Sequence, residues 1–482
     1  MNALLSVAAP RLPSAKTLID GKWLDGESLI PVLQKFDNST ICQLHQASRA
    51  QVAQAVNVTH AASQRQSWVP LDRARVLRKT AELIERNSER FVSVMVHEAG
   101  FTASDAQGEV DRSLVTLRLC AEESTRLVGQ AVSFAGSAGQ HQRLGFTLRM
   151  PLGVVCAITP FNSPLNTVIH KIGPAIAGGN SVVLKPSALA PLSSALLCET
   201  LLEAGLPPDM LALVHGGESV GQALLDEPAI AFYTFTGSTR VGRAIQAGAG
   251  LRKTQLELGS IASVIVCADA DLKRAAAKIA NASFRKAGQV CTSVQRLYVE
   301  ASVAAELAGL LKAAALEMPA GDPRLHTTRV GPLISEDAAR RVEGWVREAC
   351  DAGAEVVTGG ERQGSVISPT ILEGVSREMK VVDQEVFGPL VSILPFGTIE
   401  QALAGANDSP YGLAAGIFTR NIDSALAAAR QLRFGAVHIN ETSSSRADAM
   451  PFGGVKASGF GQEGPAYAIR EVTEERLITF TP

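Results

Sequence analysis

The chain has 482 residues, of which 46% are hydrophobic and 19% charged, and its formal net charge at pH 7 is −2. This length exceeds what one hydrophobic core usually supports, so we expect two or three domains of ordinary globular composition. Because no basic run is present that could grip a phosphate backbone, the composition argues against nucleic acid as the main partner.

The seven cysteines are scattered along the chain, and most of them lie in apolar runs. This distribution predicts free thiols in a reducing cytosol rather than a disulfide framework. The sequence has neither a CxxC nor an HExxH motif, so we expect no metal. Residues 1–11 lack the early positive charge and long apolar core of a signal peptide, and no run of about 18 apolar residues occurs. These features predict a soluble, cytoplasmic protein.

The N-terminal part of the chain changes from a helical to a β-type pattern. Apolar residues recur at helical spacing from 71 to 100, and a further helix fits residues 109–126. Between 129 and 152, short polar alternation with glycines predicts a projecting hairpin.

From residue 153 strands and helices alternate. Val154–Ile158 is predicted as a strand, and a helix follows from Pro164 to Ile176 with Ser163 as its N-cap. The same alternation continues with a strand at 181–184, a helix at 193–204, a strand at 211–214, a helix at 219–225, a strand at 232–235 and a helix at 240–247. Such alternation is typical of a doubly wound parallel sheet, in which ligands bind at the carboxyl ends of the strands.

A second α/β series begins after Glu257. It comprises a strand at 263–267, a helix at 272–287, a strand at 296–300 and further units to about residue 440, and an extended tail follows at 471–480. We therefore expect an α/β fold with two doubly wound parallel-sheet domains and a small β element.

Two residues in this second series suggest chemistry. Cys291 follows Gly288-Gln289-Val290, which is a tight and polar setting for a thiol, and Glu257 stands beside a glycine at the end of an apolar strand. A thiol nucleophile with a carboxylate base is what oxidation of an aldehyde to an acid through a thioester requires. Alone, Cys291 could be a buried structural thiol and Glu257 a solvated strand end. Asn162 could be a turn residue or an amide donor to an oxyanion.

Two other motifs are weaker. Residues 459–464 match G-x-G-x-x-G, but no strand precedes them as a dinucleotide fingerprint requires. Residues 217–221 match the nucleophile elbow of serine hydrolases, but the His-Gly-Gly segment lies directly before them rather than far upstream. The simpler interpretation is a glycine-rich turn with Ser219 as a helix N-cap.

Together these segments resemble the aldehyde dehydrogenase superfamily, in order and spacing, from Trp23 to about Phe480. Within it the chain looks most like the branch of lactaldehyde and non-phosphorylating glyceraldehyde-3-phosphate dehydrogenases. The motifs that carry the resemblance are Pro160-Phe161-Asn162-Ser163-Pro164, Gly179-Asn180 through Lys185-Pro186, Phe235-Thr236-Gly237-Ser238, Leu256-Glu257-Leu258-Gly259, Gly288-Gln289-Val290-Cys291, Glu385-Val386-Phe387-Gly388-Pro389 and Pro451-Phe452-Gly453-Gly454-Val455-Lys456.

The resemblance implies a domain organisation and a mechanism. Residues 1–128 and 151–256 would bind NAD(P), residues 257–440 would form the catalytic domain, and residues 129–150 and 456–482 would build a homodimer or homotetramer. Cys291 would attack the aldehyde, Asn162 and the Cys291 backbone N–H would hold the oxyanion, and Glu257 would activate water to release the acid. Relatives that transfer the acyl group to coenzyme A generally lack this glutamate, which disfavours that alternative. A nucleotide-binding protein without catalysis is a further alternative.

The resemblance also implies a cofactor site for NAD or NADP. Where NAD-preferring members carry a glutamate, this chain has Ala188, which removes a barrier to the 2′-phosphate of NADP. The implied cofactor residues are Ile158, Thr159, Pro160, Phe161, Lys185, Ser187, Ala188, Gly217, Gly221, Phe235, Thr236, Gly237, Ser238, Val241, Leu258, Gly259, Glu385 and Phe387.

The substrate residues implied by the resemblance are Arg112, Ser163 and Phe452. Arg112 would lie on a helix that lines the entry tunnel and could hold a carboxylate or phosphate, or it could be a surface arginine paired with Glu109 or Asp111. Since Val290 stands where some phosphate-handling relatives have arginine, we expect a small hydroxy- or carboxyl-bearing aldehyde.

Overall fold

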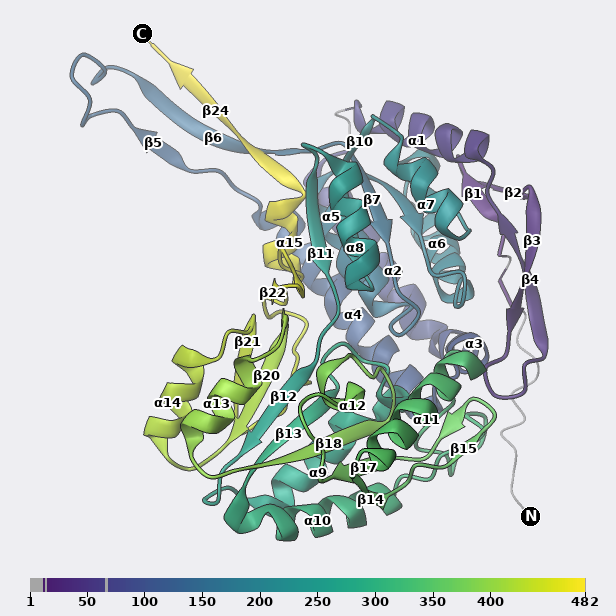
Figure 1. Ribbon diagram of the computed structural model, residues 1–482. Helices are drawn as coiled ribbons and strands as arrows, with labels where there is room; N and C mark the ends of the chain where they lie inside the picture. Colours follow the sequence, from purple (N-terminus) through teal and green to yellow (C-terminus); the bar gives the residue numbers. More distant parts are fainter. Residues whose placement is uncertain (1–11, 14, 66–67, 482) are drawn as a thin grey trace.

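A computed structural model describes residues 12, 13, 15–65 and 68–481. Figure 1 shows two lobes, each built on one large sheet, and a β ribbon that projects from the upper lobe. The signal-peptide expectation for residues 1–11 lies outside the described residues. Within the described residues, no helix is long and apolar enough to cross a membrane, and no group of three or more potential metal ligands occurs.

The first lobe contains an eight-stranded sheet in the order β2-β1-β9-β8-β7-β10-β11-β23. Strands β9, β8, β7, β10 and β11 are parallel, and the outer strands pair antiparallel. This confirms the predicted parallel sheet. The strands are β1 (Thr17–Ile19), β2 (Lys22–Leu24), β7 (Val154–Ile158), β8 (Ser181–Lys185), β9 (Leu211–Leu213), β10 (Ile230–Thr236), β11 (Lys253–Glu257) and β23 (Gly459–Phe460).

Helices cover both faces of this sheet, which explains why β7 is buried throughout. Val155 and Ala157 pack into one apolar cluster, and Val154 and Cys156 pack into a second cluster on the opposite face. The helices are α1 (Arg49–Ser63), α2 (Pro70–Arg86), α3 (Ser88–Ala99), α4 (Ala103–Arg126), α5 (Asn166–Gly178), α6 (Leu192–Glu203), α7 (Glu218–Leu225), α8 (Thr239–Ala249) and α15 (Pro465–Glu471).

Some predicted boundaries were wrong. The pattern over 71–100 is two helices separated at Asn87, and α4 begins at Ala103 rather than at 109. Ser163 is not the N-cap of α5, because that helix begins at Asn166 and its first N–H groups bond to the Glu109 carboxylate instead. Ser219 is likewise no N-cap, because Gly217 occupies that position.

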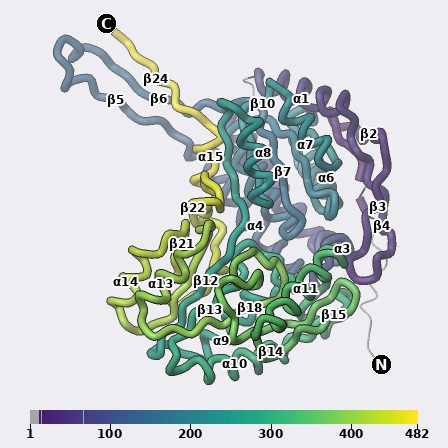
Figure 2. The backbone as a smooth tube through the Cα atoms, in the orientation of Figure 1, coloured from purple at the N-terminus to yellow at the C-terminus, as the bar shows by residue number. Residues whose placement is uncertain are grey.

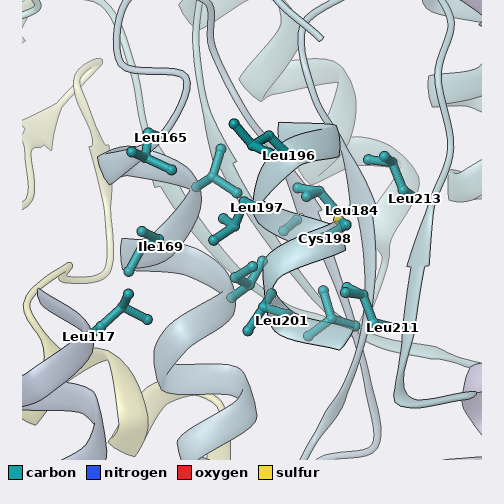
Figure 3. Close-up of a cluster of buried hydrophobic side chains, with 14 of the residues drawn as sticks. Leu117, Leu165, Ile169, Leu184, Leu196, Leu197, Cys198, Leu201, Leu211 and Leu213 are labelled. Carbon is teal, nitrogen blue, oxygen red and sulfur yellow. The ribbon is translucent and has the colours of Figure 1, made fainter. Parts of the chain in front are cut away.

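Side chains of α5 and α6 form a tight apolar layer against the sheet. In Figure 3, Leu165, Ile169, Leu197 and Leu201 point toward one another and toward Leu184 of β8. All of them are at most 1% exposed. Because truncation of such a side chain costs about 2–5 kcal/mol, this layer holds the end of β8, and with it Lys185, in one position.

The second lobe contains a seven-stranded sheet in the order β14-β17-β18-β13-β12-β20-β21, parallel except at β14. Its strands are β12 (Ala262–Val266), β13 (Val294–Glu300), β14 (Glu355–Thr358), β17 (Thr370–Glu373), β18 (Leu390–Phe396), β20 (Ala414–Phe418) and β21 (Ala436–Ile439). Its helices are α9 (Leu272–Phe284), α10 (Ala304–Leu316), α11 (Glu336–Asp351), α12 (Lys380–Asp383), α13 (Ile399–Asn407) and α14 (Ile422–Gln431).

The helix predicted to reach residue 287 ends at Phe284. Residues Arg285–Gly288 form a tight turn in which Lys286 and Ala287 have φ values of +51° and +54°. The physical reason is that Asp105 and Glu109 of α4 accept hydrogen bonds from Lys286 and hold it outside the helical path.

The projecting ribbon joins β5 (Ala131–Ser133), β6 (Leu144–Pro151) and β24 (Thr473–Phe480). The tail pairs antiparallel with β6 from Thr473 opposite Pro151 to Phe480 opposite Leu144. The predicted hairpin and extended tail are therefore present, and Figure 2 shows that they extend away from both lobes. Smaller two-stranded sheets pair β3 (Ser28–Leu33) with β4 (Thr40–Gln46), β15 (Arg362–Gln363) with β16 (Val366–Ile367), and β19 (Tyr411–Gly412) with β22 (Val455–Lys456).

Candidate active site

A cavity of about 760 Å³ opens at the carboxyl ends of the first sheet. Cys291, Glu257 and Asn162 line it, and so does every residue predicted to bind the cofactor. These are residues 158–161, Lys185, Ser187, Ala188, Gly217, Gly221, residues 235–238, Val241, Leu258, Gly259, Glu385 and Phe387. The sequence therefore selected residues that share one cavity, although their individual roles stay predictions.

The turn between β10 and α8 is suited to an anion. A Cβ atom at Gly237 would collide with the Phe235 ring, so a larger residue there would displace that ring. Ser238 caps α8 by accepting the Val241 N–H at 3.4 Å, and both residues line the cavity. The positive end of the helix dipole therefore lies at the cavity wall, where a phosphate group would be stabilised.

Lys185 ends strand β8 at the same wall. It is only 9% exposed, and burial lowers the pKa of its ammonium group to about 8. The Thr159 hydroxyl nearby is buried without a hydrogen-bond partner among the described residues. An unpaired buried hydroxyl favours a ligand with polar groups at this position.

Part of the cavity lining was not predicted from the sequence. Glu218 and Gln222 lie four residues apart on α7, each directly after one of the predicted glycines Gly217 and Gly221, and this helical spacing could have indicated them. Arg341 comes from α11 in the other lobe, donates to the Val386 carbonyl at 2.8 Å and stacks over Trp345. No local sequence signal indicates its place.

Cys291 and Glu257 come from different lobes, and both line this cavity. Glu257 is 3% exposed, and burial together with the Glu463 carboxylate raises its pKa to about 7. Burial and the Glu257 carboxylate also raise the pKa of the Cys291 thiol, although Arg446 opposes this. Glu257 Oε1 has no hydrogen-bond partner among the described residues. A carboxyl group of this kind is suited to exchange a proton near neutral pH.

Behind Glu257 lies a buried network of charges. Glu463 accepts hydrogen bonds from Lys171 at 3.0 Å and from Arg446 at 2.8 Å, and these cations hold the pKa of Glu463 well below its usual range, although burial alone would raise it. Lys171 also donates to Thr234. Glu463 therefore stays ionised, while Glu257 remains close to its titration point.

Asn162 is placed between the two lobes. Its Nδ2 donates to the Gln289 carbonyl at 2.8 Å, and its own backbone carbonyl accepts a hydrogen bond from Lys286 at 3.1 Å. The amide thus lies beside the cysteine loop, where it could turn to an oxyanion formed at the thiol.

Comparisons with known proteins agree with this geometry. Residues 23–478 match the model of the aldehyde dehydrogenase family. The chain belongs to this family. It is 43% identical to a 3-sulfolactaldehyde dehydrogenase of Priestia aryabhattai over 461 residues, covering 95% of this chain and 96% of the relative. It is 36% identical to a lactaldehyde dehydrogenase of Methanococcus maripaludis, covering 95% and 98%.

A solved NADP-dependent glyceraldehyde-3-phosphate dehydrogenase of Bacillus halodurans, complexed with NADP, superimposes with a TM-score of 0.95 at 33% identity, covering 97% of this chain and 99% of that one. The predicted family, branch and fold are therefore confirmed, and the chain is an aldehyde-oxidising enzyme. Family membership contradicts the serine hydrolase alternative, and Ser219 lies exposed in the first turn of α7.

In this aldehyde dehydrogenase the predicted substrate residues do not line the cavity. Arg112 forms a two-bond ion pair with Asp448, at 3.1 and 2.7 Å, so the expected alternative of pairing with Glu109 or Asp111 was wrong. The Ser163 hydroxyl donates to Glu109. Phe452 is 7% exposed and lies 3.9 Å beneath the Arg446 guanidinium.

Arg285 was not predicted as a site residue, and it begins the turn that leads to Cys291. Burial lowers the pKa of its guanidinium, whereas Asp105 and Cys291 act to raise it. The Ser444 hydroxyl, which Arg285 reaches, lies 3.0 Å from that of Thr292, the residue after Cys291. The Arg285 Nη2 lies 3.5 Å from the Ser444 hydroxyl, and no carboxylate of the described residues forms an ion pair with it. Arg285 therefore has charge left for a ligand, although it too lies outside the set of residues that line the large cavity.

Proposed function

We propose that this aldehyde dehydrogenase oxidises a small aldehyde bearing a hydroxyl or an anionic group to the free carboxylic acid, with NAD⁺ or NADP⁺ as hydride acceptor. The observation that carries the proposal is that Cys291, Glu257 and Asn162 all line one large cavity. A nucleophile, a base and an amide donor are the groups that this oxidation requires.

Cys291, Glu257 and Asn162 support an oxidation in two stages, which are acylation of the cysteine and hydrolysis of the thioester. Glu257 takes the thiol proton, and the Cys291 sulfur bonds to the aldehyde carbon to form a thiohemiacetal. The Asn162 amide and the Cys291 N–H stabilise the negative oxygen. A nicotinamide bound in the cavity would supply the acceptor for the hydride that leaves this carbon, and a thioester to Cys291 would remain. Glu257 then loses its proton to solvent and deprotonates the water that attacks the thioester carbon. The C–S bond breaks, the carboxylic acid leaves, and Glu257 returns the proton to the Cys291 sulfur.

The cavity residues fit a dinucleotide. The α8 N-terminus and Lys185 suit the phosphates, and Glu385 with Phe387 lies toward Cys291, where a nicotinamide ribose would be held. Ala188 presents no carboxylate to a 2′-phosphate, which permits NADP. The relative complexed with NADP supports the same assignment.

An anionic substrate follows from Arg285. Its guanidinium lacks a carboxylate partner among the described residues. It lies 3.5 Å from the Ser444 hydroxyl, which contacts Thr292 directly after Cys291, and it could bind the far end of a short aldehyde. The relatives named for 3-sulfolactaldehyde and lactaldehyde act on small hydroxy-aldehydes. Arg112, already paired with Asp448, would act less directly.

The proposal includes a homodimer or homotetramer joined through the projecting ribbon. Leu144, Phe146, Leu477 and Phe480 are exposed there, and apolar exposure of this kind is typical of an interface. The cytoplasmic location stays a prediction.

A substrate panel tests the proposal. Succinic semialdehyde and butanal have the same chain length but differ in the carboxylate, and each is assayed with NAD⁺ and with NADP⁺ while the acid product is quantified. We expect free acid in stoichiometric amount with the reduced cofactor, and a kcat/KM at least about tenfold higher for the anionic aldehyde. Acyl-coenzyme A formation without free acid would favour the acyl-transferring alternative, and preference for butanal would remove the anionic substrate.

A further inference from the structure

A buried ion pair outside the proposed catalytic set connects the two loops that carry Asn162 and Cys291. Glu109 on α4 is 3% exposed, and its Oε1 accepts hydrogen bonds from the Ser163 hydroxyl at 2.9 Å, Leu165 N at 3.0 Å and Asn166 N at 3.1 Å. This carboxylate therefore takes the place of a helix cap for α5 and fixes the segment directly after Asn162.

Lys286 makes the matching contacts from the cysteine loop. Its ammonium group donates to Glu109 Oε2 and, at 3.1 Å, to the Asn162 carbonyl, and it lies 4.3 Å over the Phe101 ring. Its backbone N–H donates to Asp105, which stands one helical turn before Glu109 on α4. One face of α4 thus holds both loops.

The backbone at this point is under strain. Lys286 and Ala287 are consecutive non-glycine residues in the left-handed region, just before the loop of Cys291. Such residues cost about 1–3 kcal/mol each and persist only where surrounding contacts fix them. The contacts to Asp105 and Glu109 are what ends α9 at Phe284 and turns the chain toward the site.

We propose that Lys286 and Glu109 are positioning residues that set the distance between the Asn162 amide and the Cys291 sulfur. Neither residue lines the cavity, and the polar groups of both side chains are already bonded to each other and to the loop of Asn162, so neither is available to the substrate or the cofactor. The inference rests on the proposed roles of Cys291 and Asn162 in oxyanion stabilisation, where a displacement of about 1 Å can lower the rate about a hundredfold.

The ion pair could instead serve stability alone, and paired variants separate the two roles. K286M leaves the Glu109 charge buried and unpaired, which destabilises the fold, whereas K286M/E109Q removes both charges and relieves that penalty. E109Q keeps an oxygen for the α5 N–H groups, but the double variant has no tether from the cysteine loop to Asn162. E109D keeps both charges and shortens the tether.

The measurements are kcat, KM, the dissociation constant of NADPH and the melting temperature. We expect K286M/E109Q to regain most of the melting temperature lost in K286M, while kcat stays about 10- to 100-fold below that of the wild type with unchanged NADPH binding. E109D should lower kcat without a comparable loss of melting temperature. Recovery of kcat together with stability in the double variant, or wild-type kcat in E109D, overturns the proposal.

A double-mutant cycle with N162A tests whether the Lys286–Glu109 ion pair acts through the Asn162 side-chain amide. If it does, K286M costs little further activity once N162A is present, whereas independent, additive losses contradict the proposal. K380M is the matched control, because Lys380 forms an exposed 2.7 Å pair with Glu348, and it should leave all four quantities unchanged. Loss of activity in C291A with wild-type kcat in E109D would reject only the positioning role of Lys286 and Glu109. Activity retained in C291A would reject the proposed mechanism itself.

Discussion

The two ends of the active site differ in how their side chains are held. At the cofactor end, glycine turns and strand ends shape the cavity wall, and each predicted residue lies on it. At the proposed substrate end, ion pairs between distant segments hold the polar side chains, such as the half-buried pair of Arg112 with Asp448 and the buried pair of Lys171 with Glu463. The first end is built from local backbone geometry, and the second from long-range charge pairing. Substitutions should therefore act on binding at one end and on chemistry or pKa at the other.

The largest effect should come from the reacting atom, where both ends meet. C291A should lower NAD(P)H formation by at least about a thousandfold, because no other group can carry the acyl intermediate. C350A, which removes another partly exposed thiol, is the control and should keep normal activity. A C291A enzyme with undiminished aldehyde oxidation would remove the cysteine mechanism.

The next effect is on hydrolysis of the thioester, although E257Q also removes the group that takes the thiol proton before acylation. E257Q should release acid about 100-fold more slowly or worse, because the amide cannot accept a proton from water. Mass spectrometry should detect an acyl adduct on the protein after one turnover. Acid release at the wild-type rate would show that Glu257 is not the base.

The sequence predicts the position of a cavity residue where that position depends on local structure. Gly237, Ser238 and Lys185 stand at strand ends, and the alternation of strands and helices predicts where those ends meet. The position of Lys286 depends on distant residues instead. The apolar pattern predicts that the helix continues through it, but its hydrogen bonds to Asp105 and Glu109 hold it in a left-handed turn.

Arg112 shows the same limit in its partner. Nearby Glu109 and Asp111 were the expected partners, yet Asp448 lies 336 residues away in sequence. The roles of Glu463 and Arg446 beside Glu257 have the same origin, since no local pattern reports which buried charges face one another. The fold was thus largely predictable, and the electrostatics of the substrate end were not.

The substrate end can be tested by comparing its arginines. R285M should raise the KM for succinic semialdehyde about tenfold or more and leave that for butanal within about twofold, because only the carboxylate uses the guanidinium. R112M should instead lower the melting temperature, since it leaves Asp448 with only its His170 and Asn166 partners. Equal changes for both aldehydes in R285M would exclude an anion-binding role.

The cofactor end can be tested at Ala188. A188E places a carboxylate at the cavity wall beside Lys185 and Ser187, where it would repel a 2′-phosphate. The KM for NADP⁺ should rise about tenfold while that for NAD⁺ stays constant or falls, and A188Q, which has the same length without the charge, should have a smaller effect. An equal change for both cofactors would place the 2′ position elsewhere.

The smallest effect is a displacement of the pH profile. Burial and Glu463 raise the pKa of Glu257 to about 7, so the carboxyl is protonated below that pH and the rate of hydrolysis should fall as pH decreases through it. E463Q removes a negative neighbour and leaves Lys171 and Arg446 facing Glu257, which should lower that pKa and move the acid limb about one unit down. K171M removes a cation and should move it up. Loss of stability alone would not displace the two profiles in opposite directions, so shifts of the same sign would mean that this network does not set the pKa of the base.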